Sequence, residues 1–256
     1  ERSLVAMAAD LVRPRDGRLA VARFEEIPDQ APPTAEAAVQ SPADRSFETR
    51  VGDLGSELGV PLQADEIISH DTKHAIVNYA RTHGVDLIVA EHEPLRLRSR
   101  LLGDPVDWVV RHAPCDVVLV DNVGYERPTD VVLAGDGSPY TPLEVRLAEA
   151  IAGATDGRIS LWQSPGRAQT AEQTQAIVDY QAELSRLLSV PVEPESIRTD
   201  GGRSRRPDLL VRRGADYRLR SVIFDRRPAV PNPGCTVLSV YPRPARQPSL
   251  ARRIVE

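Results

Sequence analysis

The stretch Ala113-Pro-Cys-Asp-Val-Val-Leu-Val120 recurs in the second half of the chain as Pro233-Gly-Cys-Thr-Val-Leu-Ser-Val240. Asp86-Leu-Ile-Val89 recurs in the same way as Asp208-Leu-Leu-Val211. The copies lie about 120 residues apart, which is too long for a solenoid repeat and suits a duplicated domain. Each copy holds a short, continuously apolar run, which is the pattern of a strand buried in a parallel sheet.

The length of 256 residues also favours two domains. We expect them at residues 1–123 and 128–256, joined by a linker around residues 122–129. The first holds 13 basic and 21 acidic residues, a net charge of −8, and the second holds 18 basic and 15 acidic residues, a net charge of +3. Two domains that attract each other explain this asymmetry. Because no aromatic-rich basic motif is present, we expect no nucleic-acid partner.

The composition, 41% hydrophobic and 27% charged, is that of an ordinary globular protein. No apolar run approaches the roughly 20 residues that a membrane helix needs. Two cysteines, Cys115 and Cys235, cannot form a disulfide framework or a zinc site alone. We therefore expect a cytoplasmic protein in a reducing setting. We expect both thiols to be small buried residues and not nucleophiles.

Apolar runs and helical periodicity alternate along both copies, which predicts a parallel, right-handed α/β sheet. The residues from 29 to 43 are rich in proline and alanine and predict a loop. Outside that loop, the expected strands are 19–24, 62–68, 87–90, 117–120, 130–134, 158–162 and 192–197, and the expected helices are 2–13, 44–58, 71–83, 105–112, 140–153 and 169–189.

The two copies differ in two places. Nothing before Glu1 matches the strand 130–134, so the opening, central strand of the first copy was cut off, is not seen, or is replaced by another segment. Where the first copy has the helix 71–83, the second has residues 198–207, with two adjacent glycines and no apolar face, which predict a loop. The apolar face left without a helix then needs another cover, either the C-terminal tail or, as we favour, a partner surface.

The stretch Ser99-Arg-Leu-Leu-Gly-Asp-Pro-Val-Asp-Trp-Val-Val-Arg-His-Ala-Pro-Cys-Asp-Val-Val-Leu-Val120 is similar to the closing helix and strand of universal stress proteins, and Asp136-Gly-Ser-Pro139 to that family's first loop. The chain resembles a tandem universal stress protein over nearly its whole length. The resemblance implies two Rossmann-like domains of the adenine-nucleotide alpha-hydrolase type, each with the strand order 3-2-1-4-5. Their last strands, 117–120 and 236–240, would pair as an internal pseudo-two-fold dimer, which removes two exposed apolar edges.

Many members of that family bind ATP through a loop G-x2-G-x9-G-[ST], whose glycines let backbone N–H groups approach phosphates. The first copy has Ala90, Glu93, Gly103 and Asp104 at these positions, so one glycine remains. Carboxylates at two of the four positions would repel phosphate oxygens. We therefore expect no bound cofactor, with ATP or AMP as the alternative. The second copy, with a one-residue gap allowed, departs from the pattern as well, with Arg212, Ala215, Phe224 and Asp225.

Asp136, Gly137 and Ser138 follow the strand 130–134 and are the candidate nucleotide contacts of the second copy. The resemblance implies that the aspartate contacts the adenine or the ribose. The other interpretation, which we favour, is that Asp136 and Gly137 turn the chain and cap the following helix.

We expect neither a metal site nor an enzyme active site. His70 and His74 are four residues apart, a spacing that can hold a metal on one helix face. However, Asp71 is the expected cap of that helix, so His70 lies before the helix and points elsewhere. A hydrolase triad built on Ser138 and His112 lacks the G-x-S-x-G elbow.

The resemblance implies a non-catalytic regulatory or sensory module. Tandem domains of this kind occur as cytosolic tails of amino-acid permeases and other transporters, and a missing opening strand fits a piece of such a longer chain. The expected partners are the second copy itself and a membrane transporter domain or a homodimer. The alternative is a free-standing cytosolic stress-response protein that binds ATP or another adenine nucleotide.

Overall fold

A computed structural model describes residues 2–28, 42–91, 105–135, 138–163, 170–196, 207–214 and 234–243. The amino-terminal half contributes α1 (Arg2–Val12), the 3-10 helix η1 (Arg13–Arg15), β1 (Leu19–Glu26), α3 (Pro42–Leu58), β2 (Leu62–Ser69), α4 (Thr72–Thr82), β3 (Leu87–Glu91), α5 (Pro105–His112) and β4 (Asp116–Asp121). The carboxyl-terminal half contributes β5 (Asp130–Gly135), α6 (Pro142–Ala154), β6 (Arg158–Gln163), α7 (Ala171–Leu187), β7 (Val192–Ser196), β8 (Leu209–Arg213) and β9 (Thr236–Tyr241).

Strands and helices alternate as predicted, and local sequence explains where several helices begin. The side chain of Asp71 accepts a hydrogen bond from the backbone N–H of His74 at 3.2 Å, so it caps α4 as predicted. Thr141 and Glu144 form a reciprocal capping box at the start of α6, so the cap of this helix is Thr141 and the expectation that Asp136 caps it was wrong. The predicted loop 29–43 is too long at its end, because α3 already begins at Pro42; proline is favoured in a first helical turn.

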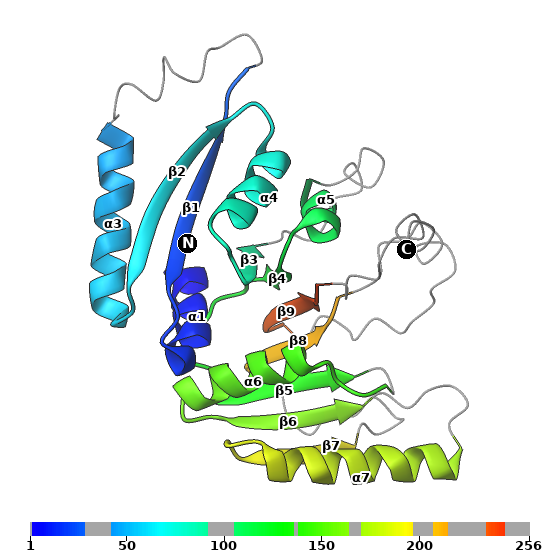
Figure 1. The fold of residues 1–256 in the computed structure, drawn as a ribbon. Coiled ribbons are helices and arrows are strands. Elements are labelled where there is room, and N and C mark those ends of the chain that lie inside the picture. The colour runs from blue at the N-terminus through cyan, green and yellow to red at the C-terminus, as the bar shows by residue number, and fades with distance from the viewer. Residues whose placement is uncertain are drawn as a thin grey trace, which may run out of the picture.

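Seven strands form one sheet with the order β3-β4-β9-β8-β5-β6-β7 (Figure 1). Within it, the five strands of the carboxyl-terminal half run β7-β6-β5-β8-β9, which is the expected order 3-2-1-4-5. All pairs in the sheet are parallel except β4 with β9. The fold is therefore α/β with a mostly parallel sheet, as predicted.

The antiparallel pair β4–β9 joins the two halves, which confirms the predicted pairing of 117–120 with 236–240. Val118 lies opposite Val240, and both side chains are fully buried. The main apolar core extends across this junction from α1 through β4 and β9 to α6 and β6, and α1 also packs against α6. The two halves therefore share one core.

The amino-terminal half is divided where its opening strand was expected. β1 and β2 pair with each other in parallel and form a separate two-stranded sheet, with α3 packed on β2 and α4 packed on β1 (Figure 1). β3 and β4 belong to the seven-stranded sheet instead. The strands that would flank a central strand in the order 3-2-1-4-5, β1 and β3, are therefore not joined by any described strand.

Candidate functional site

Ligands of open parallel sheets bind beyond the carboxyl ends of the strands, where the strand order reverses. In the carboxyl-terminal half that point lies at β5, between β6 and β8. Three residues end these strands there: Gly135 on β5, Gln163 on β6 and Arg213 on β8. Ser138, one of the predicted site residues, lies in the segment that follows β5. Asp136 and Gly137 are outside the described residues.

The side chain of Arg213 contacts both the segment after β5 and the first turn of α6. Its guanidinium donates hydrogen bonds to the Ser138 hydroxyl at 3.4 Å and to the Pro139 carbonyl at 2.9 Å. The same group lies 3.6 Å from the carboxylate of Glu144, whose side chain is only 2% exposed. A buried carboxylate needs such a partner, and this one also lies in the first turn of α6, where the helix dipole favours negative charge.

Gln163, the last residue of β6, contacts the end of β5 and the segment that follows it. Its side-chain amide donates a hydrogen bond to the Ser138 carbonyl at 3.2 Å. The amide also packs directly over Gly135, so closely that a β-carbon at Gly135 would overlap with it. The absence of a side chain at Gly135 therefore provides room for Gln163 and not an opening for a ligand.

Two tyrosines complete the packing around these strand ends. The hydroxyl of Tyr140 donates a hydrogen bond to the carbonyl of Trp162 at 2.9 Å, and burial raises the pKa of this tyrosine far above its usual value. The ring of Tyr241, at the end of β9, lies where a β-carbon of Gly214 would be. Among the described residues, side chains of the protein itself therefore pack over the carboxyl ends of these strands.

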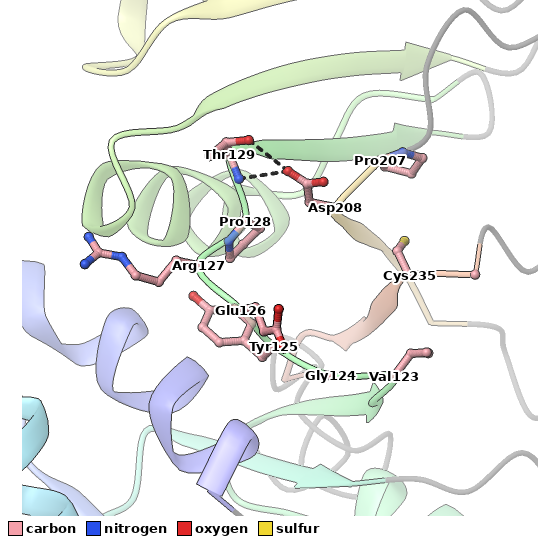
Figure 2. Close-up of a pocket in the computed structure, with 11 residues that line it drawn as sticks. Val123, Gly124, Tyr125, Glu126, Arg127, Pro128, Thr129, Pro207, Asp208 and Cys235 are labelled. Atoms are coloured by element: carbon pink, nitrogen blue, oxygen red, sulfur yellow. Dashed lines mark hydrogen bonds between the residues drawn. The ribbon is translucent and has the colours of Figure 1, made fainter.

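A cavity of about 580 Å³ lies at the opposite, amino-terminal ends of these strands, beside the linker (Figure 2). It lies where β5, β8 and β9 begin, next to Thr129, Asp208 and Cys235. One carboxylate oxygen of Asp208 accepts hydrogen bonds from the backbone N–H and the hydroxyl of Thr129, both at 2.9 Å (Figure 2). The same oxygen accepts a third bond from the N–H of Asp130 at 3.0 Å, so Asp208 fixes the start of β5. Sequence reasoning did not predict this cavity, because it depends on how the linker folds back on the sheet.

The predicted burial of the cysteines is confirmed, because Cys115 and Cys235 are both buried, and they form no disulfide with each other. Burial is the main cause that raises the pKa of the Cys115 thiol to about 11, and the carboxylates of Asp116 and Asp86 add to it. A thiol with this pKa is neutral at physiological pH and is therefore a poor nucleophile.

His70 and His74 point to different partners, as predicted. The Nδ1 atom of His70 lies 3.2 Å from the carbonyl oxygen of Ile27, whereas Nδ1 of His74 lies 2.8 Å from the carboxylate of Asp71. The hydrogen bond from His74 is the main cause that lowers the pKa of Asp71 to about 2. The ring of His74 also packs against Trp108 of α5. Within the described ranges, no group of three or more His, Cys, Asp or Glu side chains is arranged to hold a metal ion.

The universal stress protein family model matches residues 1–121, which end with the last residue of β4. The solved structures similar to the whole chain include a universal stress protein from Archaeoglobus fulgidus DSM 4304, with a TM-score of 0.55 and 12% identity over 91% of this chain and 90% of that one. Another is the cytoplasmic domain of a prokaryotic cation chloride cotransporter, with a TM-score of 0.54 and 12% identity over 94% of this chain and 92% of that one. At these identities the likeness shows the fold alone. No curated protein matches the chain.

Of the four predicted phosphate-loop positions in residues 1–121, only one lies within the described residues. Ala90 lies near the carboxyl end of β3, paired with Leu119, whereas Glu93, Gly103 and Asp104 lie outside the described residues. Because β4 and β9 are antiparallel, β3 and β5 run in opposite directions, and their carboxyl ends lie on opposite sides of the sheet along the strand direction. The structure therefore does not bring Ala90 and Ser138 together.

In the described part of the chain, no helix is both long and apolar enough to cross a membrane.

Proposed function

We propose that this chain is a non-catalytic regulatory module made of two stress-protein-like domains, residues 1–123 and 128–256, which acts at the cytoplasmic face of a membrane transporter. The family match at residues 1–121 supports the first domain. The strand order β7-β6-β5-β8-β9, together with the sequence repeat, supports a second domain of the same type. The similar cotransporter domain supports the link to a transporter, because its fold covers almost the whole of this chain.

The observation that carries the regulatory interpretation is the set of bonds that Arg213 makes at the end of β5. In a nucleotide site at this place, the backbone after β5 and the cation at the end of β8 would be available to the ligand. Here the guanidinium is used by the Pro139 carbonyl and the Glu144 carboxylate, and Gln163 occupies the space over Gly135. These contacts support a module that acts through its surfaces and not through a bound nucleotide.

The test is a calorimetric titration of the protein with ATP and with AMP at physiological salt. We expect dissociation constants no tighter than about 1 mM, equivalent to about −4 kcal/mol. The matched variant is Asp136→Ala, which removes the carboxylate that a nucleotide would contact and is expected to change nothing. Micromolar binding that Asp136→Ala weakens would overturn the proposal and favour a nucleotide-binding stress protein.

The transporter link is tested separately, on the reading frame that encodes this chain. We expect that frame to encode, on the amino-terminal side of Glu1, some ten apolar stretches of roughly 20 residues each. In that protein, deletion of the module should change the rate of solute transport without removing the transporter from the membrane. A frame without such stretches would refute the link.

A further inference from the structure

Trp108 is in contact with two histidine rings, one from each of two neighbouring helices. The ring of His74 in α4 lies 4.3 Å from the indole of Trp108 in α5, measured between ring centroids. The ring of His112, the last residue of α5, stacks on the same indole at a centroid distance of 4.1 Å. We call these three side chains the His74–Trp108–His112 cluster. Two titratable rings therefore take part in the contact between α4 and α5.

The cluster lies between two parts of the amino-terminal half. α4 packs against β1 and β2 as well as against α5, and Figure 1 shows α4 between β1 and α5. Residues 113–115 alone connect α5 to β4, and β4 pairs with β9 at the junction of the two halves. A change in the contact between α4 and α5 therefore acts between the β1–β2 sheet and that junction.

His74 also contacts a carboxylate. Its Nδ1 atom lies 2.8 Å from Oδ2 of Asp71, and 54% of the His74 side chain is exposed, so protons reach the ring from solvent. The hydrogen bond from His74 is the main cause that lowers the pKa of Asp71 to about 2. Asp71 therefore stays ionised over the range in which imidazoles ordinarily gain a proton. A protonated His74 forms an ion pair with this carboxylate and places a cation against the indole ring, and both contacts are attractive.

The other charges near α4 are distributed so that this attraction decides the sign. The described charged and titratable side chains of α4, its flanking residues and the elements packed against it are His70, Asp71, Lys73, His74, Tyr79, Arg81 and His83 around α4, Arg23, Glu25, Glu26, Asp65 and Glu66 in β1 and β2, and Asp107, Arg111 and His112 in α5. Arg23 pairs with Glu66 in the β1–β2 sheet. Lys73 lies 3.4 Å from Oδ2 of Asp71, farther than His74 does, and His112 contacts the indole. Because charge interactions weaken with distance, the contact of His74 with Asp71 outweighs repulsion from these two cations.

We propose that the His74–Trp108–His112 cluster is a pH-sensitive contact, in which protonation of His74 tightens the packing of α4 against α5 and loss of that proton loosens it. The ion pair with Asp71 and the cation on the indole exist only while His74 is charged, so the stabilisation is present at acid pH and is lost as the pH rises. The proposal concerns α4, α5 and the side chains between them. It therefore does not depend on the transporter link or on the nucleotide titration.

The first test follows the fluorescence of Trp108 in a Trp162→Phe protein, which has no other tryptophan. The emission of an indole changes when a charge forms beside its ring, so we expect a change between pH 7.5 and pH 5.5. His74→Gln should remove about half of that change or more, because His112 also contacts the ring. The matched control is His83→Gln, which alters another α4-flanking histidine whose ring stacks on Tyr79 instead. A change of the same size with and without His74 would overturn the proposal, and so would an effect of His83→Gln as large as that of His74→Gln.

The second test needs no tryptophan substitution. We expect amide hydrogen exchange in Thr72–Thr82, corrected for its intrinsic dependence on pH, to be about twofold to fivefold slower at pH 5.5 than at pH 7.5, the size typical of an exposed charged pair. Exchange in Ala171–Leu187 of α7 should not differ, and His74→Gln should abolish the difference in α4. Asp71→Asn keeps an oxygen that can cap α4 and removes the charge, so it should reduce the difference. Exchange in α4 that is equal at both pH values or faster at pH 5.5, or an undiminished difference in His74→Gln or Asp71→Asn, would refute the proposal.

Discussion

Leu87→Ala and Leu209→Ala are the same substitution at matching positions of the repeat, and we expect them to have unequal effects. The side chain of Leu209 is fully buried in the shared core, on a strand with neighbours on both sides. Truncation of such a leucine leaves a cavity and costs about 3–4 kcal/mol of the free energy of unfolding. Leu87 is only partly buried against the same core. Its truncation loses less apolar contact and leaves no closed cavity, so we expect about 1–2 kcal/mol.

The assay is urea unfolding followed by circular dichroism and by tryptophan fluorescence. The two tryptophans divide the signal, because Trp108 lies in α5 of the amino-terminal half and Trp162 in β6 of the other half. A Trp108→Phe background makes the fluorescence report on β6 alone. Losses that agree within about 0.5 kcal/mol would refute the reasoning, because matched truncations in equally packed strands should cost the same.

Three other results are expected. Gly214→Ala places a methyl group against the ring of Tyr241 and should lower the free energy of unfolding by about 1–3 kcal/mol. Gly52→Ala, in α3, meets no atom within 4 Å and should raise the free energy of unfolding by about 0.5–1 kcal/mol. Urea unfolding measures both changes. The hydrogen bond from His74 is the main cause that lowers the pKa of the Asp71 carboxylate from 3.8 to about 2. Its contribution to stability is therefore complete above about pH 4 and is lost as the pH falls through 2. The thermal midpoints of wild type and Asp71→Ala should differ at pH 6 and converge near pH 2. Cys115, with a pKa near 11, should react with a thiol reagent at pH 8 only after urea is added, and rapid labelling of the native protein would contradict its burial.

Most of the fold follows from signals that are local in the sequence. The apolar runs around Val117–Val120 and Val237–Val240 indicated two strands with exposed edges, and the pairing of β4 with β9 is the solution that buries both. The caps at Asp71 and Thr141 set helix starts because a single side chain satisfies the backbone there. The division of the first sheet was harder to predict, because a strand pattern shows that a strand forms and not which edge it leaves unpaired.

The candidate site was predicted much less well than the fold. The sequence placed Ser138 at the correct end of β5, but it did not show that Arg213 and Gln163 would reach it. Those contacts join β8 and β6 to a segment that lies far from them in the chain, so no local pattern contains them. One signal was present: an arginine at the end of the buried run Leu209–Val211, at the edge where ligands of parallel sheets bind. The orientation of the Arg213 side chain could be known only from the packing of α6, which brings the Glu144 carboxylate close to the guanidinium.

The antiparallel β4–β9 junction has a consequence for how the two halves can change over evolutionary time. An antiparallel edge is self-complementary, so each half, if separated at the linker, would present an edge able to pair with a copy of itself. In such a homodimer every substitution would appear twice, once on each side of the symmetry axis. Fusion into one polypeptide keeps the same junction and removes that constraint. One half can therefore carry Arg213 at the end of β8 while the other carries Glu91 at the matching position of β3, and both choices leave the central pairing intact.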